Sequence, residues 1–403
     1  MLLENDHYPQ DSRVRNEAST LVSAGYQVSV ICPKSSGQRW RESVNGVRVY
    51  RYPAPPAGSG FLTYLWEYGY CLVMSFVLSI VVALRRKIDI IHTHNPPDIF
   101  VLIAMFYKVL GARVVFDHHD LAPEMYYARF GNKGHRLVYR ALVFFERLSC
   151  RVADHVIATN QSYKAVQMER HGVPEERITI VRNGPDLDRL QRVDPDPDLS
   201  QNAVTIIGYV GTMGFQDGID YFLRAVRHLV YDLRRTDVFC VLVGKGDAWQ
   251  SLRAYATELE IDKYVWFTGR ISDVDLLRYL SAADICVDPD PSNPFNDRST
   301  MIKMMEYMAL GKPIVAFDLP EHRVTAQDAA VYARPNDELD FATKIAWLMD
   351  HPEERRERGS KGRKRVETTL AWPHQVNDLL EVYRSLDEQL ARKRSVFMRR
   401  RSP

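Results

Sequence analysis

A lysine and a glutamate three residues apart, Lys303 and Glu306, lie in the segment of this 403-residue chain with the most chemical information. Ser299 and Thr300 precede them, and both residue types favour the first position of a helix. A helix N-terminus binds phosphate through its free N–H groups and its dipole. The pattern predicts a diphosphate site, with Lys303 neutralising a leaving group and Glu306 accepting hydrogen bonds from ribose hydroxyls. The alternative is a surface ion pair between Lys303 and Glu306, worth less than about 1 kcal/mol.

Two glycine-containing turns follow predicted strands in the same half of the chain. Gly211, Thr212 and Gly214 form the first turn, and Gly244 and Lys245 belong to the second. Glycine lets the backbone approach a ligand closely, and a helix is expected after each turn. Together the turns favour a nucleotide site, although a tight strand-to-helix turn explains either of them alone.

The first half of the chain has a histidine pair at the end of a predicted strand. His118 and His119 precede Asp120, and Glu124 follows four residues later. Polar side chains beyond the carboxyl end of a strand lie where open α/β sheets bind ligands. We therefore expect these residues on the acceptor side of a site.

Two arginines, Arg13 and Arg15, stand just after the first predicted strand. They either belong to a solvated helix start or contact donor phosphate or an anionic, lipid-linked acceptor. The sequence alone leaves both interpretations open.

Short apolar runs alternate with amphipathic stretches in both halves, which predicts an α/β fold with two doubly wound, Rossmann-like domains. Their ligand site is expected in the crevice between them. We expect an N-terminal domain over 1–190, a C-terminal domain over 191–371, and a helix and tail over 372–403 that return to the first domain. The polar, proline-containing segment 185–203 is typical of a linker, and the first strand is unusually short. The predicted strands are 28–32, 88–92, 113–117, 156–159, 178–181, 204–210, 238–243, 265–268, 285–288, 313–316 and 330–332.

Composition narrows the class of protein. A net charge of +2 gives no indication of nucleic-acid binding. Five scattered cysteines without a C-x-x-C pair argue against a disulfide framework and a structural zinc site. With no signal-peptide pattern at the start, we expect a cytoplasmic protein.

An uncharged apolar stretch, 68–84, precedes three basic residues. A membrane span needs about 20 apolar residues, and Ser75 and Ser79 continue a polar stripe from Glu67 and Cys71 on one helical face. A buried or membrane-touching helix is favoured over a true span. The basic tail 392–403 is either solvated or attracted to an anionic membrane surface.

The order of these motifs resembles that of the family-4 retaining glycosyltransferases of the GT-B fold. The matching segments are 11–17, 24–26, 116–124, 182–184, 208–212, 243–246, 267–270 and 306–314, with Glu146 and Asp154 between them. The resemblance implies that the C-terminal domain binds a nucleotide-sugar, with a UDP-sugar favoured and a GDP-sugar possible. It also implies a role in bacterial surface polysaccharide synthesis. The stretch 68–87 and the basic tail predict a glycan or polyprenyl-linked acceptor and a location on the inner face of the plasma membrane.

By family position, His119, Lys303 and Glu306 are the expected catalytic residues, and no metal or other cofactor is implied. Two departures from the family pattern stand out. Arg298 occupies the place of a glutamate eight positions before Glu306, and the loop 211–218 lacks the usual Arg and Lys. Arg270, Arg298 or Lys303 is expected to supply the missing positive charge.

Retention is expected without a carboxylate nucleophile, because the leaving diphosphate can itself take the acceptor proton. Asp186/Asp188 and Asp288/Asp290 have the spacing of a metal motif, but the first pair is interpreted as linker and the second as a loop. A non-catalytic nucleotide- or glycan-binding subunit and a sugar-nucleotide epimerase are the alternative functions.

Overall fold

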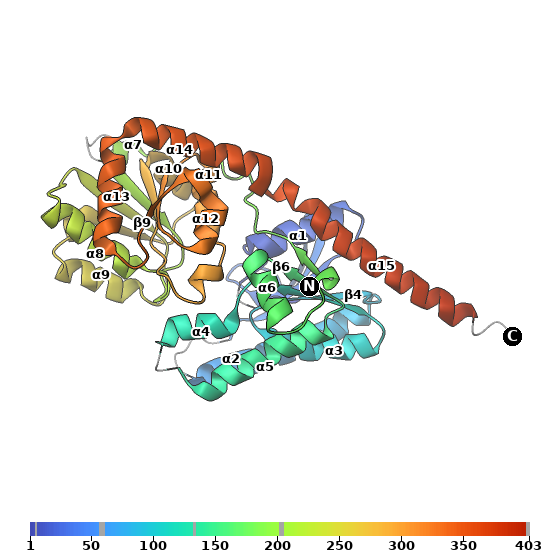
Figure 1. Ribbon diagram of the computed structural model, residues 1–403. Coiled ribbons are helices and arrows are strands. Elements are labelled where there is room, and N and C mark those ends of the chain that lie inside the picture. Colours follow the sequence, from blue (N-terminus) through green and yellow to red (C-terminus); the bar gives the residue numbers. More distant parts are fainter. Residues whose placement is uncertain (5, 56–60, 132–133, 201–204, 400–403) are drawn as a thin grey trace. The chain divides into compact units, whose positions relative to one another are not determined.

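The computed structural model describes residues 1–4, 6–55, 61–131, 134–200 and 205–399, and the chain divides into two compact units. Unit 1 comprises 1–127, 132–183 and 375–403, and unit 2 comprises 128–131 and 184–374. The chain leaves unit 1 after Asn183 and returns to it at Gln375. The domain boundaries predicted from the sequence were 190/191 and 371/372. Figure 1 shows strands and helices alternating along the chain in both units.

Unit 1 is built on a mainly parallel sheet. Its strands are β1 (Ser29–Lys34), β2 (Arg41–Val44), β3 (Val47–Pro53), β4 (Ile90–His94), β5 (Arg113–His118), β6 (His155–Ala158) and β7 (Ile178–Ile180). The hydrogen-bonded orders are β1-β3-β2 and β4-β5-β6-β7, with only β2 antiparallel to its neighbour. Its helices are α1 (Ser12–Ser23), α2 (Phe61–Ala83), α3 (Val101–Val109), α4 (Ala122–Phe130), α5 (Arg136–Val152), α6 (Gln161–Glu169) and α15 (Val376–Arg399).

The first residues of the chain join the two halves of this sheet. Leu2 forms parallel bridges to Ile31 of β1 and to Thr93 of β4. Its N–H donates to the His92 carbonyl at 2.9 Å, and the His94 N–H donates to the Leu2 carbonyl at 3.1 Å. The short first strand expected from the sequence therefore occupies the centre of the sheet, where neighbours on both sides satisfy its backbone.

Helix α15 belongs to unit 1, although the long segment 184–374 of unit 2 precedes it in the chain. The hydroxyl of Tyr383 lies 2.8 Å from His92 Nδ1, and the Tyr383 ring contacts Tyr26 edge-on at 5.3 Å. Buried Leu379, Val382 and Leu386 give the helix an apolar face toward the unit. Of the basic tail, residues 400–403 and the side chains from 394 onward lie outside the described residues.

Unit 2 has a six-stranded, wholly parallel sheet. Its strands are β8 (Thr205–Val210), β9 (Val238–Val243), β10 (Val265–Gly269), β11 (Ile285–Asp288), β12 (Ile314–Phe317) and β13 (Ala330–Ala333). Its helices are α7 (Pro197–Ser200), α8 (Ile219–Arg227), α9 (Trp249–Glu258), α10 (Asp273–Ala282), α11 (Ile302–Ala309), α12 (Pro320–Ala326), α13 (Glu338–Asp350) and α14 (Pro352–Arg365). The order β10-β9-β8-β11-β12-β13 reverses direction between β8 and β11, which is the topological switch point of a Rossmann-like sheet. The doubly wound fold predicted from the sequence is confirmed.

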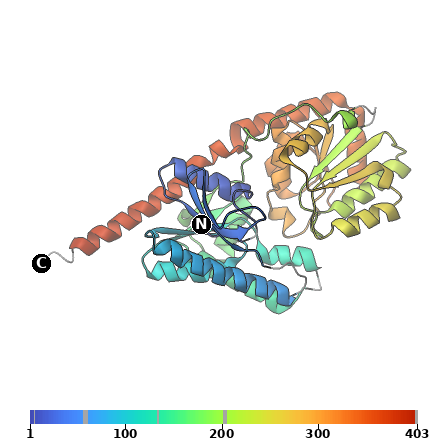
Figure 2. The same cartoon turned by 180° about the vertical axis from the view of Figure 1, so that it is seen from behind.

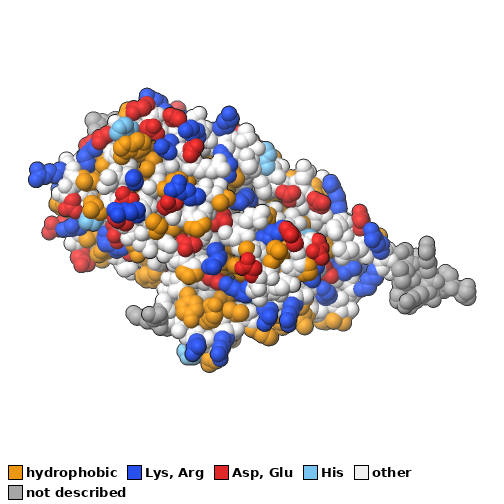
Figure 3. All heavy atoms as spheres, in the orientation of Figure 1, with side chains coloured by type: hydrophobic (Ala, Val, Ile, Leu, Met, Phe, Trp, Pro, Cys, Tyr) orange, Lys and Arg blue, Asp and Glu red, His pale blue; other side chains and the backbone are white. Residues whose placement is uncertain are grey.

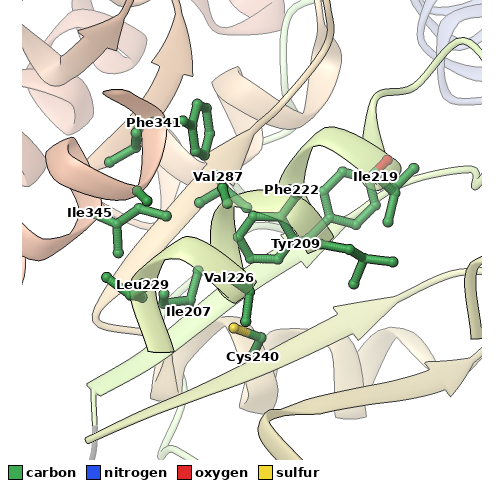
Figure 4. Packing of buried hydrophobic residues seen from close by; sticks show 14 of the residues in the cluster. Ile207, Tyr209, Ile219, Phe222, Val226, Leu229, Cys240, Val287, Phe341 and Ile345 are labelled. Atoms are coloured by element: carbon green, nitrogen blue, oxygen red, sulfur yellow. The ribbon is translucent and has the colours of Figure 1, made fainter. Parts of the chain in front are cut away.

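Helices cover both faces of this sheet, as Figure 2 shows from behind. Ile207 packs with α8, α9 and α13 on one face, whereas its neighbour Ile206 packs with α10 and α11 on the other. In Figure 4, Phe222 of α8 and Tyr209 of β8 lie close to Val287 of β11. Both faces are apolar because the strands are buried on both sides, which explains their continuous hydrophobic runs.

The segment expected to be a linker is partly packed. Leu190 is 2% exposed and Leu199 is 7% exposed, and both join the apolar cluster under α11. The prediction relied on the absence of a periodic apolar face, but two isolated leucines are enough to fix an irregular segment to a core. Residues 201–204 of this segment lie outside the described residues.

Candidate active site

The glycine turns of unit 2 follow β8 and β9 and pack against one another. A Cβ on Gly244, where φ is +134°, would lie 1.9 Å from the Gly211 carbonyl oxygen. A Cβ on Gly246 would lie 2.6 Å from the carbonyl oxygen of Met213. The packing of one loop on the other therefore requires glycine at both positions. A tight strand-to-helix turn, the alternative to a nucleotide site in the sequence analysis, is enough to explain them.

Three polar side chains near the carboxyl ends of β8, β9 and β10 are exposed: Thr212, Lys245 and Arg270. The Lys245 ammonium lies 5.4 Å from the centre of the Trp249 ring. These donor-side candidates lie along one edge of the sheet, at and beside the switch point.

Lys303, in the first turn of α11, binds two carboxylates at the end of β11. Its Nζ lies 2.5 Å from Asp290 Oδ2 and 3.1 Å from Asp288 Oδ1, and its side chain is 12% exposed. Burial alone would lower the pKa of Lys303, but Asp288 and Asp290 raise it well above the ordinary value. The lysine is therefore a fixed positive charge.

The two aspartates differ in pKa because their charges repel each other. Burial and the Asp288 carboxylate raise the pKa of Asp290. Burial would also raise the pKa of Asp288, but Lys303 and His322 lower it. Asp288, Asp290 and His322 place three possible metal-ligand atoms within 4.8 Å of one another. The Lys303 ammonium binds the two carboxylates of this group, so a divalent cation would have to compete with it.

Glu306 lies one turn further along α11 and does not pair with Lys303. It forms an ion pair with Arg189, whose Nη1 lies 3.8 Å from Oε1, and its side chain is 19% exposed. Burial raises the pKa of Glu306, and Arg189 partly opposes this. The alternative of a surface ion pair between Lys303 and Glu306 is wrong, because each has another partner.

The start of α11 differs from the prediction. The helix begins at Ile302 with Met301 at its N-cap, and no side chain caps it. The Ser299 hydroxyl donates to the Phe295 carbonyl at 2.8 Å, and the Thr300 hydroxyl lies 3.4 Å from Glu321 Oε2. A short 3-10 turn, Asn296–Arg298, ends just before Ser299. Because this turn precedes the two hydroxyl residues, α11 begins only after Thr300. Arg298, at its end, donates to the Pro294 carbonyl at 2.7 Å.

In unit 1, Asp117 at the end of β5 is the centre of a buried polar network. Arg13 binds it through two nitrogens, with Nε–Oδ2 at 2.6 Å and Nη2–Oδ1 at 2.7 Å. His94 Nδ1 lies 2.9 Å from Asp117 Oδ2, and His119 Nδ1 lies 3.5 Å from the same oxygen. Burial alone would raise the pKa of Asp117, but Arg13 and His119 hold it well below the ordinary value.

This geometry corrects the role expected for Arg13. Its side chain also donates to the Val181 carbonyl at 3.0 Å and to Asn183 Oδ1 at 2.5 Å, and the residue is 5% exposed. All three of its side-chain nitrogens bind groups of unit 1. Arg15 is half-buried and donates to the Pro9 carbonyl at 3.0 Å.

His119 and Asp120 remain partly open to solvent. The His119 side chain is 12% exposed, and its N–H donates to Asn95 Oδ1 at 2.8 Å. The Asp120 N–H donates to the same oxygen at 3.2 Å. Burial alone would lower the pKa of His119, but Asp117 raises it above the ordinary value. Asn95 therefore orients this loop, and Asp117 orients the imidazole.

His118 and Glu124 point into unit 1, whereas the sequence predicted both on the acceptor side of a site. His118 Nε2 lies 3.0 Å from Glu146 Oε1, and its Nδ1 lies 3.2 Å from Gln167 Nε2. His118 has no exposed surface, and Glu124, 7% exposed, forms an ion pair with Arg170. Successive side chains of an extended segment alternate in direction, so His118 points inward and His119 does not.

Several residues of these networks were not predicted from the sequence. Glu17 lies 3.2 Å from Arg13, and His92 and His94 each lie 3.8 Å from its Oε2. The spacing of Arg13 and Glu17, four apart on a helix, and the alternation of His92 and His94 on a strand were available signals. They become informative only when a partner such as Asp117 is known to lie opposite.

Two family models match the chain. The model described as "Glycosyl transferase 4-like domain" matches residues 10–184, and the model described as "Glycosyl transferases group 1" matches residues 204–351. Together they cover most of the chain, and the break between them lies close to the passage from unit 1 to unit 2.

Individual proteins agree with these models over the whole length. An uncharacterized glycosyltransferase of Methanocaldococcus jannaschii is 25% identical, with 93% of this chain and 94% of that protein covered. Sucrose-phosphate synthase of Thermosynechococcus elongatus has a similar fold, with a TM-score of 0.78, 20% identity, and coverage of 96% of this chain and 95% of that one. Anabaena HepE, solved in complex with UDP and glucose, gives a TM-score of 0.70 at 16% identity, with 95% and 99% covered.

Proposed function

The chain belongs to the family-4, group 1 glycosyltransferases of the GT-B fold, and from that premise we propose the reaction that it catalyses. It transfers a sugar, with retention of configuration and without a metal ion, from a nucleoside diphosphate sugar to a glycan or lipid-linked glycan. The observation that carries this proposal is the buried lysine Lys303, held at the switch point of unit 2 by two carboxylates. A UDP-sugar is the favoured donor, in line with the UDP bound by Anabaena HepE.

Lys303 supplies the charge that a departing diphosphate requires. Its pKa is raised, so it stays protonated through the reaction, and the aspartates fix its position before substrate binds. A preorganised charge of this kind stabilises a developing anion without reorganisation at the moment of reaction. Lys245, Arg270 and Arg298 add positive charge around it, in place of the Arg and Lys absent from loop 211–218.

The remaining donor-side residues bind the nucleoside and the phosphates in this proposal. Glu306, partly exposed beside Lys303, accepts hydrogen bonds from the ribose hydroxyls. Thr212 and the backbone around Gly211, Gly214 and Gly244 line the diphosphate, although Gly244 is already required by loop packing. Ser299 and Thr300 contribute next to the helix start and not as its caps.

In unit 1, His119 and Asp120 contact the transferred sugar or the acceptor, because they are the open members of a network that is otherwise buried. The bond between the anomeric carbon and the diphosphate oxygen breaks, and the acceptor oxygen bonds to that carbon on the same face. The acceptor proton passes to the leaving phosphate oxygen. The protein therefore positions groups and stabilises charge, and it needs no nucleophile of its own.

Calorimetry with UDP, GDP, ADP and dTDP in the presence of EDTA tests the donor half of the proposal. We expect one diphosphate to bind, and we expect Glu306→Ala and Lys303→Met to lose it. Lys303→Met alone would leave two buried carboxylates facing each other, so Lys303→Met with Asp290→Asn is the variant that separates binding from folding. Lys361→Ser, an exposed change on α14, is the matched control. Binding of none of the four would contradict the proposal, and binding without turnover on any acceptor would favour a non-catalytic subunit.

A specific observation favours an anionic membrane surface as a second partner. On α2 the polar stripe Cys71, Ser75 and Ser79 is buried, whereas Val73 is 59% exposed and Val77 is 49% exposed. Ser79 accepts a hydrogen bond from the Tyr107 hydroxyl at 3.0 Å. The helix thus turns its polar side inward and its apolar side outward, the reverse of a helix on a soluble protein.

Helix α3 extends this apolar surface. Phe106 of α3 contacts Phe76 of α2 at 5.2 Å, and Val109 and Leu110 are 88% and 66% exposed. Figure 3 shows hydrophobic side chains among Lys and Arg over α4 and α5 as well. Exposed apolar side chains flanked by basic residues favour binding at the interface of an anionic bilayer.

Helix α2 is also the one helix of the described residues that passes a length and composition test for a membrane span, over Trp66–Ala83. The inward hydrogen bond of Ser79 favours contact with the bilayer surface over a span. We propose that the enzyme acts at the cytoplasmic face of a bacterial membrane, in the synthesis of surface polysaccharide.

Vesicle flotation tests this surface. We expect the protein to float with vesicles containing phosphatidylglycerol, and Val73→Asp with Val77→Asp to reduce the floating fraction strongly. Val274→Asp is the control, because Val274 is 67% exposed on α10 of unit 2. Equal flotation of all three proteins, or none for the wild type, would contradict the proposal.

A further inference from the structure

Unit 2 contains a cavity of about 740 Å³ at the edge of its sheet opposite to Lys303. Asp284 lines it just before β11 begins, and Lys312 and Pro313 line it just before β12 begins. The proposed donor site lies where these strands end, and this cavity lies where they start. It is therefore separate from the donor site and independent of the proposed function.

The side chains around this cavity are strongly basic. Six of the lining residues are cationic: Arg192, Lys312, Arg355, Arg356, Arg363 and Lys364. Only two are acidic, Asp284 and Glu367. Glu367 pairs with Arg363 at 2.5 Å, and Asp284 accepts the Ile206 N–H at 2.9 Å. The excess of positive charge is thus not balanced within the cavity wall.

Backbone carbonyls at the ends of helices hold the cations in place. Lys312 Nζ donates to the carbonyls of Ser281 and Ala283 at 2.7 Å each, at the end of α10. Arg192 donates to the carbonyls of Leu310 and Gly311, at the end of α11, at 2.5 and 2.7 Å. Helix C-termini attract cations, which explains why the residues gather here. A carbonyl carries only a partial charge, so these contacts orient the cations without neutralising them.

Two cations at the rim have no such anchor. The side chains of Arg356 and Lys364 are exposed, and neither has an ion-pair partner within the described part of unit 2. Inside the cavity, burial lowers the pKa of Lys312, and the neighbouring Arg192 lowers it further. A buried lysine next to an arginine is stabilised when an anion enters.

We propose that this cavity binds a small ligand with several negative charges, of the class of phosphorylated carbohydrates. Guanidinium groups match phosphate oxygens in geometry, and a phosphate neutralises several fixed cations at once. The volume is that of a small-molecule site and exceeds a single inorganic ion. None of the described residues that line the cavity is aromatic, so a nucleobase would find no stacking partner among them. Ser281 and Ser360 are present instead for sugar hydroxyls.

Calorimetric titration of the whole protein with glucose 1-phosphate and with inorganic pyrophosphate, at low ionic strength, tests this site. We expect both probes to bind, and Arg356→Ser with Lys364→Ser to weaken binding at least tenfold. These two rim residues are exposed and make no ion pair with the described residues, so the double variant should fold. Lys361→Ser, also on α14 but outside the cavity, should bind as the wild type does. Lys245→Ser removes a cation from the proposed donor side and should leave this binding unchanged.

The controls separate this inference from the proposed function. Binding that survives the rim variant but is lost in Lys245→Ser would place the probes at the donor side and overturn the cavity proposal. Absence of binding for both probes would also overturn it. A third arm uses vesicles containing phosphatidylglycerol: rim-dependent binding to the vesicles, without binding of the free probes, would identify a lipid headgroup and contradict a carbohydrate phosphate.

Discussion

The two units use the carboxyl edges of their sheets differently. In unit 1, Arg13 and His94 both bind Asp117, and all three residues are almost completely buried. In unit 2, Lys303 is held in a similar way, but Thr212, Lys245 and Arg270, which follow β8, β9 and β10 at the same edge of the sheet, are exposed. The same topological position can therefore hold a rigid buried network or exposed charge. In unit 1 the polar residues fix one partly open imidazole, His119, whereas in unit 2 the exposed cations are the ones that we propose to bind a charged ligand.

The largest effect on stability is expected from Arg13→Met, which tests the buried side of this comparison. The change removes the bidentate partner of Asp117 and leaves a carboxylate buried without its cation. Such a loss costs about 3–5 kcal/mol of the free energy of unfolding. Urea denaturation followed by circular dichroism measures it. Arg15→Met, at a half-buried arginine bound to one carbonyl, should cost much less; equal costs would show that the Asp117 network does not stabilise unit 1.

Lys303→Met tests the charged side, and we expect a loss of about 10²–10³-fold in turnover, the usual result of removing one group that stabilises an anion. The variant also removes the cation that pairs with Asp288 and Asp290, so its free energy of unfolding should fall. Adding Asp290→Asn should restore thermal stability but not turnover. If activity returned together with stability, Lys303 would have a structural role only.

Asp98 in unit 1 tests how burial alone affects stability. Burial raises the pKa of Asp98 from 3.8 to about 7. Between these values the folded state keeps a proton that the unfolded state has lost, so this group contributes less stability as the pH rises. The unfolding free energy of Asp98→Asn, relative to wild type, should therefore increase from pH 4 to pH 7, by no more than about 1.4 kcal/mol per pH unit.

A carboxylate of unit 2 provides the control of opposite sign. A hydrogen bond from Arg235 lowers the pKa of Asp237, which is partly exposed. Its contribution to stability is present above the ordinary carboxyl pKa and is lost as the pH falls. Asp237→Asn should therefore become less stable than wild type as the pH rises. The same pH trend for both variants would contradict the contrast between the two sites.

The smallest effect is expected from Arg270→Ser on the exposed edge of unit 2. Unfolding should change by less than about 0.5 kcal/mol, as is usual for a surface position. The affinity for the bound diphosphate should fall by several-fold and less at high salt, because exposed charges are screened. Calorimetry at two ionic strengths measures both. A larger effect on stability than on affinity would remove Arg270 from the donor site.

The sequence predicted all six strands of unit 2 and five strands of unit 1 because each is a short apolar run between turns, as at 238–243 and 285–288. It missed β2, which is mostly polar, and β3, in which arginines interrupt the apolar residues. It was less successful where two distant segments meet. For Gly244 the sequence left a ligand contact and a tight turn open, and the structure shows the glycine packed on the Gly211 carbonyl. For Arg13 it left a solvated helix start and a ligand contact open, and the structure shows a third arrangement, in which Arg13 binds Asp117, 104 residues away. The polar stripe of α2 was recognised, but not that it points inward.

The fold class, the family and the residue types at each strand end could therefore be inferred from the sequence, because hydrophobic periodicity and turn residues are local properties. Which of those residues are already paired became visible only in the folded chain. His118 and His119 are neighbours in the chain, yet one is bound to Glu146 inside the unit and the other is partly exposed. Whether a polar side chain is paired depends on the side chains that lie opposite it in the folded unit. The local sequence pattern does not show a partner that lies far along the chain.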